Sequence, residues 1–334
     1  MTGSEAVATM TDSSDRHDKP SAGAPAADVL VARSDTRAVA VVPGIVLQVG
    51  TSARHRHEFV YFAVRNKKLL VGISVVMLFV LVAVFGPLLT DYAPLAVSSA
   101  ASRPPSAQHW LGTTYFGEDV FAQLVYGTRA SFEVGLLGGV FAVIIGMTIG
   151  FAAGYRGGLV DEILNLFTNV VICIPLFAIL LIIGGYLKGL SVFDEALLIG
   201  LISWPWAARA IRAQTFTLKS REFVGLARLS GERSAKIITR EIAPNMSSYL
   251  FLTFILLFGG AILIASFVDF VGLGPSGTVT LGTMMNEAFF WNALLLHVWW
   301  WFIPPGACIT CIVGGLYLMN AGLDEVFNPK LRAL

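Results

Sequence analysis

The sequence predicts an all-helical protein that crosses a membrane about six times. The chain has 334 residues, of which 55% are hydrophobic and only 13% are charged, and its mean hydropathy is +0.72. Soluble globular proteins carry roughly 25% charged residues, so this chain has too few charges to cover a water-exposed surface of its size. The charges also cluster between long uncharged stretches, which is typical of several bilayer spans.

Six apolar runs are long enough to cross the hydrocarbon core, which takes about 20 helical residues. They cover residues 69–90, 129–154, 160–187, 194–211, 247–273 and 295–320. The fourth run is the weakest, because Asp194 and Glu195 shorten its start and Pro205 interrupts it. Pro304 and Pro305 are expected to kink the sixth run. Prolines are tolerated in spans where neighbouring helices satisfy the freed backbone groups.

The distribution of lysine and arginine predicts the orientation. With the N-terminus inside, 16 of these residues flank the inner ends of the spans and three flank the outer ends. Both termini of this cell-membrane protein are therefore expected in the cytoplasm, with a long external loop at 91–128 and a long inner loop at 212–246. We expect residues 1–53 to be a disordered cytoplasmic tail, residues 54–68 a basic interfacial segment, and residues 69–334 the transmembrane domain.

The inner loop has the pattern of two short helices joined by a turn. Its first half places Phe223, Leu226 and Ala227 on one apolar stripe, at the i, i+3, i+4 spacing of a helix. Gly231 then supplies a turn, and a second helical stretch is expected to end at Pro244. Such an element can dock in a groove of a partner and transmit a push, or it can simply rest on the lipid headgroups. Periodicity leaves both interpretations open.

This loop resembles the coupling-loop signature of the permease subunits of ATP-binding-cassette importers. The signature runs Glu-Ala-Ala, three residues, Gly, and a Pro thirteen residues later. Ala227, Gly231 and Pro244 match it, whereas Gly225 and Leu226 stand where the family has Glu and the first Ala. The resemblance implies that coupling contacts to an ATPase lie at six positions: Glu222, Gly225, Ala227, Gly231, Glu232 and Pro244.

The resemblance covers about residues 60–332 and points to the oligopeptide and dipeptide class, whose relatives also include nickel permeases. Within that class it favours the "C"-type subunit, which has one span ahead of the common five-helix core. Residues 109–131 resemble the family pattern Leu-Gly-Thr-Asp, Gly-Arg-Asp and Tyr-Gly-x-Arg-x-Ser, with Thr114 and Glu118 replacing its Asp and Arg. The chain keeps Leu111, Gly112, Thr113, Gly117, Asp119, Tyr126, Gly127, Arg129 and Ser131. Further matches lie at 153–162, at Phe270, Gly272, Leu273 and Gly274, and at Asn328, Pro329 and Lys330.

The resemblance implies the type I importer permease fold and a non-catalytic part in ATP-driven import. The expected partners are a second homologous permease, two cytoplasmic ATPases, an extracytoplasmic substrate-binding protein and the lipid bilayer. Oligopeptides or dipeptides are the expected cargo, and nickel or oligosaccharides, carried by relatives of this architecture, remain alternatives. The sequence has no Gly-x-x-x-x-Gly-Lys-Ser/Thr phosphate loop. We therefore expect ATP and magnesium on the ATPases, and neither cofactor nor catalytic residue on this chain.

Two other classes of protein compete with this interpretation. One is a secondary transporter or channel that works without ATP, and the other is a scaffold that moves no cargo. A secondary transporter needs paired ionisable residues at membrane depth or an inverted repeat, and we recognise neither in the sequence. The five His are scattered and Cys308 and Cys311 lie in an apolar run, so no metal site is expected. The net charge of +1 gives no case for nucleic-acid binding.

Four polar residues in the spans are candidates for the transport path or its gate. Asn165, Thr168 and Asn169 form a polar face on the third span, which either lines a path or joins helices through hydrogen bonds. Asp269, near the outer end of the fifth span, either contributes to an exit or gate or lies at the interface with water. The residues alone leave both choices open.

Overall fold

A computed structural model describes residues 31–34, 37–42, 45–49, 63–187 and 189–327 of the chain. The chain divides into two units, Met1–Glu58 and Phe59–Leu334. The described part of the first unit is a three-stranded antiparallel sheet in the order β1-β2-β3. Its strands are β1 Val31–Ser34, β2 Arg37–Val42 and β3 Ile45–Val49.

This sheet lies where the sequence analysis predicted part of a disordered tail. The strands are rich in valine and isoleucine, whose branched side chains favour extended backbone. Their register pairs Val31 with Ala40 and Val42 with Ile45. The prediction rested on the mixture of charged and small residues and on the lack of a helical period, and strands of four to six residues have no helical period. The rest of the predicted tail, and residues 54–62 of the interfacial segment, lie outside the described residues.

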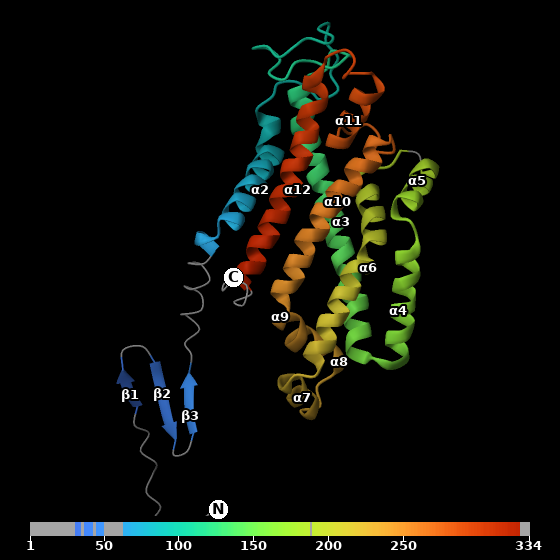
Figure 1. Cartoon of the computed structure of the whole chain (residues 1–334). Helices are drawn as coiled ribbons and strands as arrows, with labels where there is room; N and C mark the ends of the chain where they lie inside the picture. The colour runs from blue at the N-terminus through green and yellow to red at the C-terminus, as the bar shows by residue number, and fades with distance from the viewer. Residues whose placement is uncertain (1–30, 35–36, 43–44, 50–62, 188, 328–334) are drawn as a thin grey trace, which may run out of the picture. The chain divides into compact units, whose positions relative to one another are not determined.

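The described part of the second unit is a bundle of helices with one isolated β-bridge (Figure 1). The long helices are α2 Lys67–Phe85, α3 Val120–Arg156, α4 Gly158–Cys173, α5 Leu176–Tyr186, α6 Val192–Lys219, α10 Ser247–Phe270, α11 Leu281–Phe290 and α12 Trp299–Phe327. Short helices α7–α9 connect α6 to α10 at one end of the bundle, which we call the α7 end. The opposite end carries α11 and the non-helical segment 89–119, and we call it the α11 end.

Polar side chains fix where several helices begin. Asp119 caps α3 by accepting a hydrogen bond from the backbone N–H of Ala122 at 2.7 Å, so α3 starts at Val120, ahead of the predicted span 129–154. Ser191 and Asp194 form a reciprocal capping box at the start of α6. Each cap satisfies backbone donors that have no partner within the helix.

The predicted third span is broken in the structure. Residues 160–187 were expected to form one helix, but α4 and α5 meet at an angle of 75°. The break falls at Ile174 and Pro175, where the residue before proline has extended backbone angles. Proline disfavours the helical region for the residue that precedes it. By contrast, α6 and α12 continue through Pro205 and through the predicted kink at Pro304 and Pro305.

Helix length and composition identify most of the predicted spans within the described residues. Four helices qualify, namely α2 with its following turn, α3, α10 and α12, and a fifth is added if α4 and α5 count as one bent span. The predicted fourth span, 194–211, lies in α6 but is not among them, because Asp194, Glu195, Arg209 and Arg212 reduce its apolar character. The helix has 28 residues, or about 42 Å at 1.5 Å per residue, which is long enough to span.

Glycines on α3 let α6 approach it backbone to backbone. A Cβ atom at Gly146 would lie 2.7 Å from Cβ of Ala207, and one at Gly150 would lie 2.8 Å from the carbonyl oxygen of Ala208. One turn further, a Cβ at Gly154 would lie 2.8 Å from the carbonyl oxygen of Arg212. This four-residue repeat of small residues is a common interface in membranes, where van der Waals packing drives helix association. It makes α3 and α6 one packed pair along most of α6, while the first turns of α3 extend beyond α6 (Figure 1).

Substitution of Gly150 by alanine tests this contact. The added methyl group cannot fit against the Ala208 carbonyl, so Gly150→Ala should destabilise the protein by about 1–3 kcal/mol through overpacking. Gly260→Ala on α10 is the matched control, because a Cβ there meets nothing within 4 Å, and alanine favours helix over glycine by up to about 1 kcal/mol. Thermal unfolding in detergent should show a lower midpoint for Gly150→Ala alone, and equal midpoints would contradict the close packing.

Candidate functional site

The α7 end is built by four consecutive short elements. Helix α7 covers Glu222–Leu229 and α8 covers Ser234–Ile237; a π-helical turn, Ile238–Ile242, and α9, Ala243–Asn245, then lead into α10. We refer to residues 220–246 as the α7–α9 connection. Its two short helical parts and the turn between them confirm the predicted helix–turn–helix pattern.

Gly231 makes the turn of this connection with a φ of +74°. Its backbone N–H donates to the carbonyl of Arg228 at 3.0 Å, and the N–H of Glu232 donates to that of Ala227 at 3.2 Å. These two bonds close the end of α7 in the way that a glycine in the left-handed region allows. A Cβ at Gly231 would meet no atom within 4 Å, so the constraint at this position is backbone conformation and not space.

One face of α7 is anchored in the bundle. Val224 is fully buried and packs in a cluster with Phe151 and Tyr155 of α3 and with Ile237 and Ile242 of the connection. The cluster therefore joins α7 to the end of α3 and to the chain that enters α10. Any shift of α7 has to carry these neighbours with it or open the cluster.

A polar contact supports the same anchor. The guanidinium carbon of Arg228 lies 5.1 Å from the ring centroid of Tyr155, and its Nε donates to the Tyr155 hydroxyl at 3.4 Å. Lys219, the last residue of α6, places its Nζ 6.0 Å from the same ring. Cations over an aromatic face are attracted by the ring quadrupole. Tyr155 thus links α3, the end of α6 and α7.

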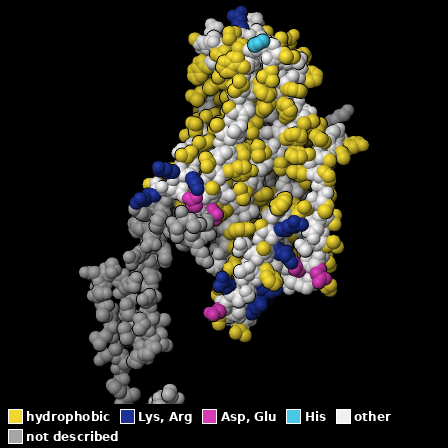
Figure 2. Space-filling model, viewed as in Figure 1, with side chains coloured by type: hydrophobic (Ala, Val, Ile, Leu, Met, Phe, Trp, Pro, Cys, Tyr) yellow, Lys and Arg dark blue, Asp and Glu magenta, His cyan; other side chains and the backbone are white. Residues whose placement is uncertain are grey.

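The opposite face of α7 is apolar but uncovered. Leu226 is 65% exposed and Leu229 is 87% exposed, and they are three residues apart on one face. The residues of the predicted apolar stripe, Phe223, Leu226 and Ala227, all lie on α7 but differ in burial. Phe223 and Ala227 pack with the buried cluster, whereas Leu226 projects from the molecule. In Figure 2 this end combines hydrophobic side chains with a concentration of lysine and arginine.

The remaining predicted coupling residues lie in this connection, mostly at its surface. Glu222 is exposed, Gly225 has open space around its Cα, and Glu232 forms an ion pair with Lys236 one turn later. Pro244 is exposed, and the helical stretch continues beyond it to Asn245. Pro244 was predicted to stop this stretch. The π-helical turn before it instead accommodates the ring and the missing backbone donor.

The predicted polar face of α4 is engaged with α6. Asn169 accepts a hydrogen bond from Nη2 of Arg209 at 2.6 Å, and nearby Asp161 forms a bidentate ion pair with Arg212 at 2.5 and 2.6 Å. Thr168 is buried and donates to its own helix at the Leu164 carbonyl. The contacts of Asn169 and Asp161 join α4 to α6, which is one of the two roles considered for this face. Asn165 is half-buried on the same helix.

Asp269 is not at an interface with water. It is 1% exposed and accepts a 2.5 Å hydrogen bond from Oγ1 of Thr280, the capping residue of α11. Glu195 of the neighbouring α6 is 2% exposed, and neither oxygen of its carboxyl has a hydrogen-bond partner among the described residues. The structure therefore contains a buried pair of ionisable groups that the sequence analysis did not find. The sequence did contain one signal for this position. Ser191 and Asp194 have the spacing of a capping box, which starts the helix ahead of Glu195 and so places Glu195 within α6.

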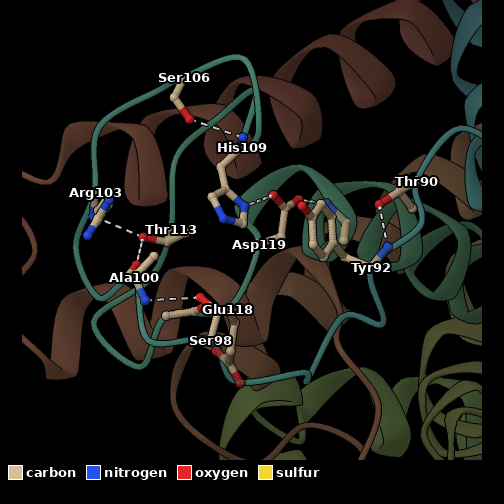
Figure 3. Close-up of polar contacts among 12 residues, drawn as sticks. Thr90, Tyr92, Ser98, Ala100, Arg103, Ser106, His109, Thr113, Glu118 and Asp119 are labelled. Carbon is tan, nitrogen blue, oxygen red and sulfur yellow. Dashed lines mark hydrogen bonds and ion pairs between the residues drawn. The ribbon is translucent and has the colours of Figure 1, made fainter.

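The segment 89–119 at the α11 end is tied together by polar contacts (Figure 3). Nδ1 of His109 lies 2.8 Å from Oδ2 of Asp119, which also caps α3. Glu118 accepts from Thr114 at 3.1 Å and from Gln123 at 2.9 Å. These bonds explain why this non-helical segment packs in an ordered way on the first turn of α3. The sequence analysis predicted a loop over 91–128, whose last residues belong to α3 in the structure.

The motif residues of α3 divide between two faces of the helix. Gly127 allows the backbone at Thr280 to approach, since a Cβ there would lie 3.1 Å from that carbonyl carbon. Oγ of Ser131 accepts a hydrogen bond from the backbone N–H of Leu281 at 3.1 Å. These two residues thus hold the start of α11. Tyr126 and Arg129 lie on another face and line a cavity of about 320 Å³.

Residues 146–333 match the family described as "Binding-protein-dependent transport system inner membrane component". The chain is 31% identical over 272 residues to the dipeptide transport system permease protein DppC of Alkalihalophilus pseudofirmus, covering 80% of this chain and 88% of that protein. It is also 31% identical over 272 residues to the oligopeptide transport system permease protein OppC of Bacillus subtilis, covering 80% and 87%.

A solved structure of the MetNI methionine ABC transporter, in an inward-facing conformation, aligns with 63% of this chain and 95% of its own, with a TM-score of 0.48 and 16% identity. The family assignment rests on the sequence matches. The chain belongs to the family of binding-protein-dependent transport system inner membrane components. The predicted permease subunit of an ATP-binding-cassette importer and its multi-pass helical membrane fold are confirmed.

Glu287 on α11 gives the α11 end a pH dependence. Burial, and then repulsion from Glu118, raise the pKa of Glu287 to about 7, compared with about 4.3 for a free glutamate. Because the folded pKa is raised, this carboxyl supports stability fully below about pH 4.3, and that support is lost as the pH rises through about 7. Between about pH 5 and pH 8 the thermal midpoint of the wild type should fall more than that of Glu287→Gln.

The exposed Glu162→Gln on α4 serves as the control and should follow the wild type. Equal pH dependence in the wild type and Glu287→Gln would contradict the assignment of this titration to Glu287.

Proposed function

We propose that this chain is the permease subunit through which an ATP-binding-cassette importer moves dipeptides or oligopeptides across the cell membrane. The support for peptide cargo comes from the relatives named as dipeptide and oligopeptide transport permeases. The proposed complex also contains a second homologous permease, two cytoplasmic ATPases and an extracytoplasmic binding protein. ATP and magnesium bind the ATPases, since the sequence of this chain has no phosphate loop.

The two-faced character of α7 is the observation that carries the mechanism. Its inner face holds Val224 in the cluster with Phe151 and Tyr155, and its outer face presents Leu226 and Leu229 to a partner. A helix that merely rested on headgroups would not need a buried anchor to α3. An apolar knob with a rigid base is suited to enter a groove on an ATPase and to transmit its movement.

The movement follows from these contacts. When two ATPases close on ATP, each carries its docked α7 along. The buried cluster transfers that displacement to α3 and to the start of α10, and the glycine-mediated contact transfers it to α6. The bundle then rocks as a body against its partner permease, which alternates access to a path between them. The predicted residues of the coupling contact remain Glu222, Gly225, Ala227, Gly231, Glu232 and Pro244.

The orientation of the chain can be tested by chemical labelling. The charge bias predicts that the α7 end is cytoplasmic and the α11 end is external. Ala235→Cys and Ala107→Cys, both at exposed positions, should be made in a chain whose three native cysteines are replaced. A membrane-impermeant maleimide added to intact cells should label position 107 and not position 235. The reverse pattern would overturn the proposed orientation.

The coupling role can be tested at Gly231. Valine resists the left-handed backbone that the turn requires, so Gly231→Val should tilt α7 while leaving the helices of the bundle inserted. Uptake by the reconstituted complex should fall at least about tenfold, with ATP hydrolysis either lost or no longer stimulated by loaded binding protein. Gly189→Val is the matched control, because it places the same residue at a glycine with a φ of +76° and open space around its Cβ, outside the α7–α9 connection.

Glu222→Ala should have a smaller effect, since an exposed charge contributes only about 0–1 kcal/mol. Normal uptake and normal stimulated hydrolysis by Gly231→Val would show that the α7–α9 connection is not the coupling element.

A further inference from the structure

A cavity at the α11 end carries two opposite charges whose purpose the coupling mechanism does not explain. It has a volume of about 320 Å³ and is lined by Tyr126, Arg129 and Glu133 of α3, together with Pro94, Val192 and Thr278. The three α3 residues follow i, i+3 and i+7 spacing, which places them on one face of the helix. Gly127 and Ser131 hold α11 from a different face.

The two charges do not neutralise each other. Arg129 and Glu133 are four residues apart and both are exposed, yet among the described residues no ion pair or hydrogen bond of either side chain is found. An i, i+4 pair with the cation nearer the N-terminus is the weaker arrangement on a helix. Both charged groups thus remain available to a ligand that carries a charge of each sign.

We propose that this cavity binds a dipeptide, or the end of a longer peptide, as a zwitterion, with Arg129 receiving the carboxylate and Glu133 the ammonium group. This proposal rests on the peptide transport function proposed above. Arginine is suited to bind carboxylates through two parallel hydrogen bonds. The hydroxyls of Tyr126 and Thr278 in the same wall are available to the peptide bond.

The size of the cavity limits the ligand. Pockets for small molecules measure about 300–1,000 Å³, so this one accepts one or two residues. An extended dipeptide spans at most about 7 Å, which suits two long side chains whose Cβ atoms are about 5–6 Å apart.

The direct test uses saturation-transfer NMR. It measures the binding of alanyl-alanine to the purified, assembled transporter in the absence of its extracytoplasmic binding protein. Arg129→Gln and Glu133→Gln should each weaken binding about tenfold or more, the size expected for loss of one charge-assisted hydrogen bond. Arg129→Lys should restore part of the affinity. Arg103→Gln, an exposed arginine outside the cavity at the same end, is the matched control and should bind as the wild type.

Blocked peptides separate a binding role from a structural one. Amidation of the carboxylate should weaken binding to the wild type but make no further difference in Arg129→Gln, and N-acetylation should behave likewise for Glu133→Gln. A structural defect would lower all affinities together and would remove this pattern. If both variants bind alanyl-alanine as the Arg103→Gln control does, the cavity is not a peptide site.

Uptake of labelled peptide by the wild-type complex is measured in parallel. If the wild-type complex takes up peptide but Arg129→Gln and Glu133→Gln bind alanyl-alanine as tightly as the wild type does, only this inference is overturned. Charge-dependent binding without any peptide uptake supports the zwitterion site and overturns the proposed cargo.

Discussion

The close contact between α3 and α6 is the constraint on which the rest of the structure depends. Gly146, Gly150 and Gly154 bring the two helix backbones together along the α7 half of the bundle. Both helices end at the α7 end, where Tyr155 and Lys219 meet. At the other end, α3 holds the start of α11 through Gly127 and Ser131, while α6 carries the buried Glu195. One packed pair therefore connects the two ends that a transporter has to coordinate.

This arrangement gives a physical meaning to coupling at a distance. Packed cores and helix interfaces are not continuously deformable, so a push on α7 is not absorbed where it is applied. In the proposed mechanism, Val224 passes it to the cluster with Phe151, and the glycine contacts pass it on along the bundle. The α11 end, with its cavity and its buried carboxyls, would then change position relative to the proposed partner permease. No separate chain of signalling residues is required for this account.

Local signals in the sequence were sufficient to predict much of the structure of the α7 end. The turn at Gly231 and the helix of α7 follow from residue types that act within one or two turns, and the structure has both. Periodicity left open which of the apolar residues of α7 meets the bundle, so the different burial of Phe223 and Leu226 did not follow from it. That choice is made by Phe151 and Tyr155, which lie some 70 residues earlier in the chain.

Other features could not be predicted because they depend on tertiary contacts. The break at Pro175 had a local signal, but its 75° bend depends on what α4 and α5 pack against. Glu195 and Asp269 are buried by helices that are distant in the sequence and come together only when the chain folds. From the sequence alone, both residues were therefore placed at the ends of predicted spans. The family resemblance predicted the class of protein correctly, while the strands between Val31 and Val49 had no counterpart in it.

The central claim is that α7 moves as one body with α3 and α6. Double electron–electron resonance between spin labels at Arg221→Cys and Arg156→Cys measures this directly, because both positions are exposed and lie at the start of α7 and at the end of α3. In the reconstituted complex, a label pair across the two permeases reports that the transition has occurred on ATP binding. Our account predicts that the distance between positions 156 and 221 stays the same through that transition. A shift of several ångströms between them while the permeases switch would contradict it.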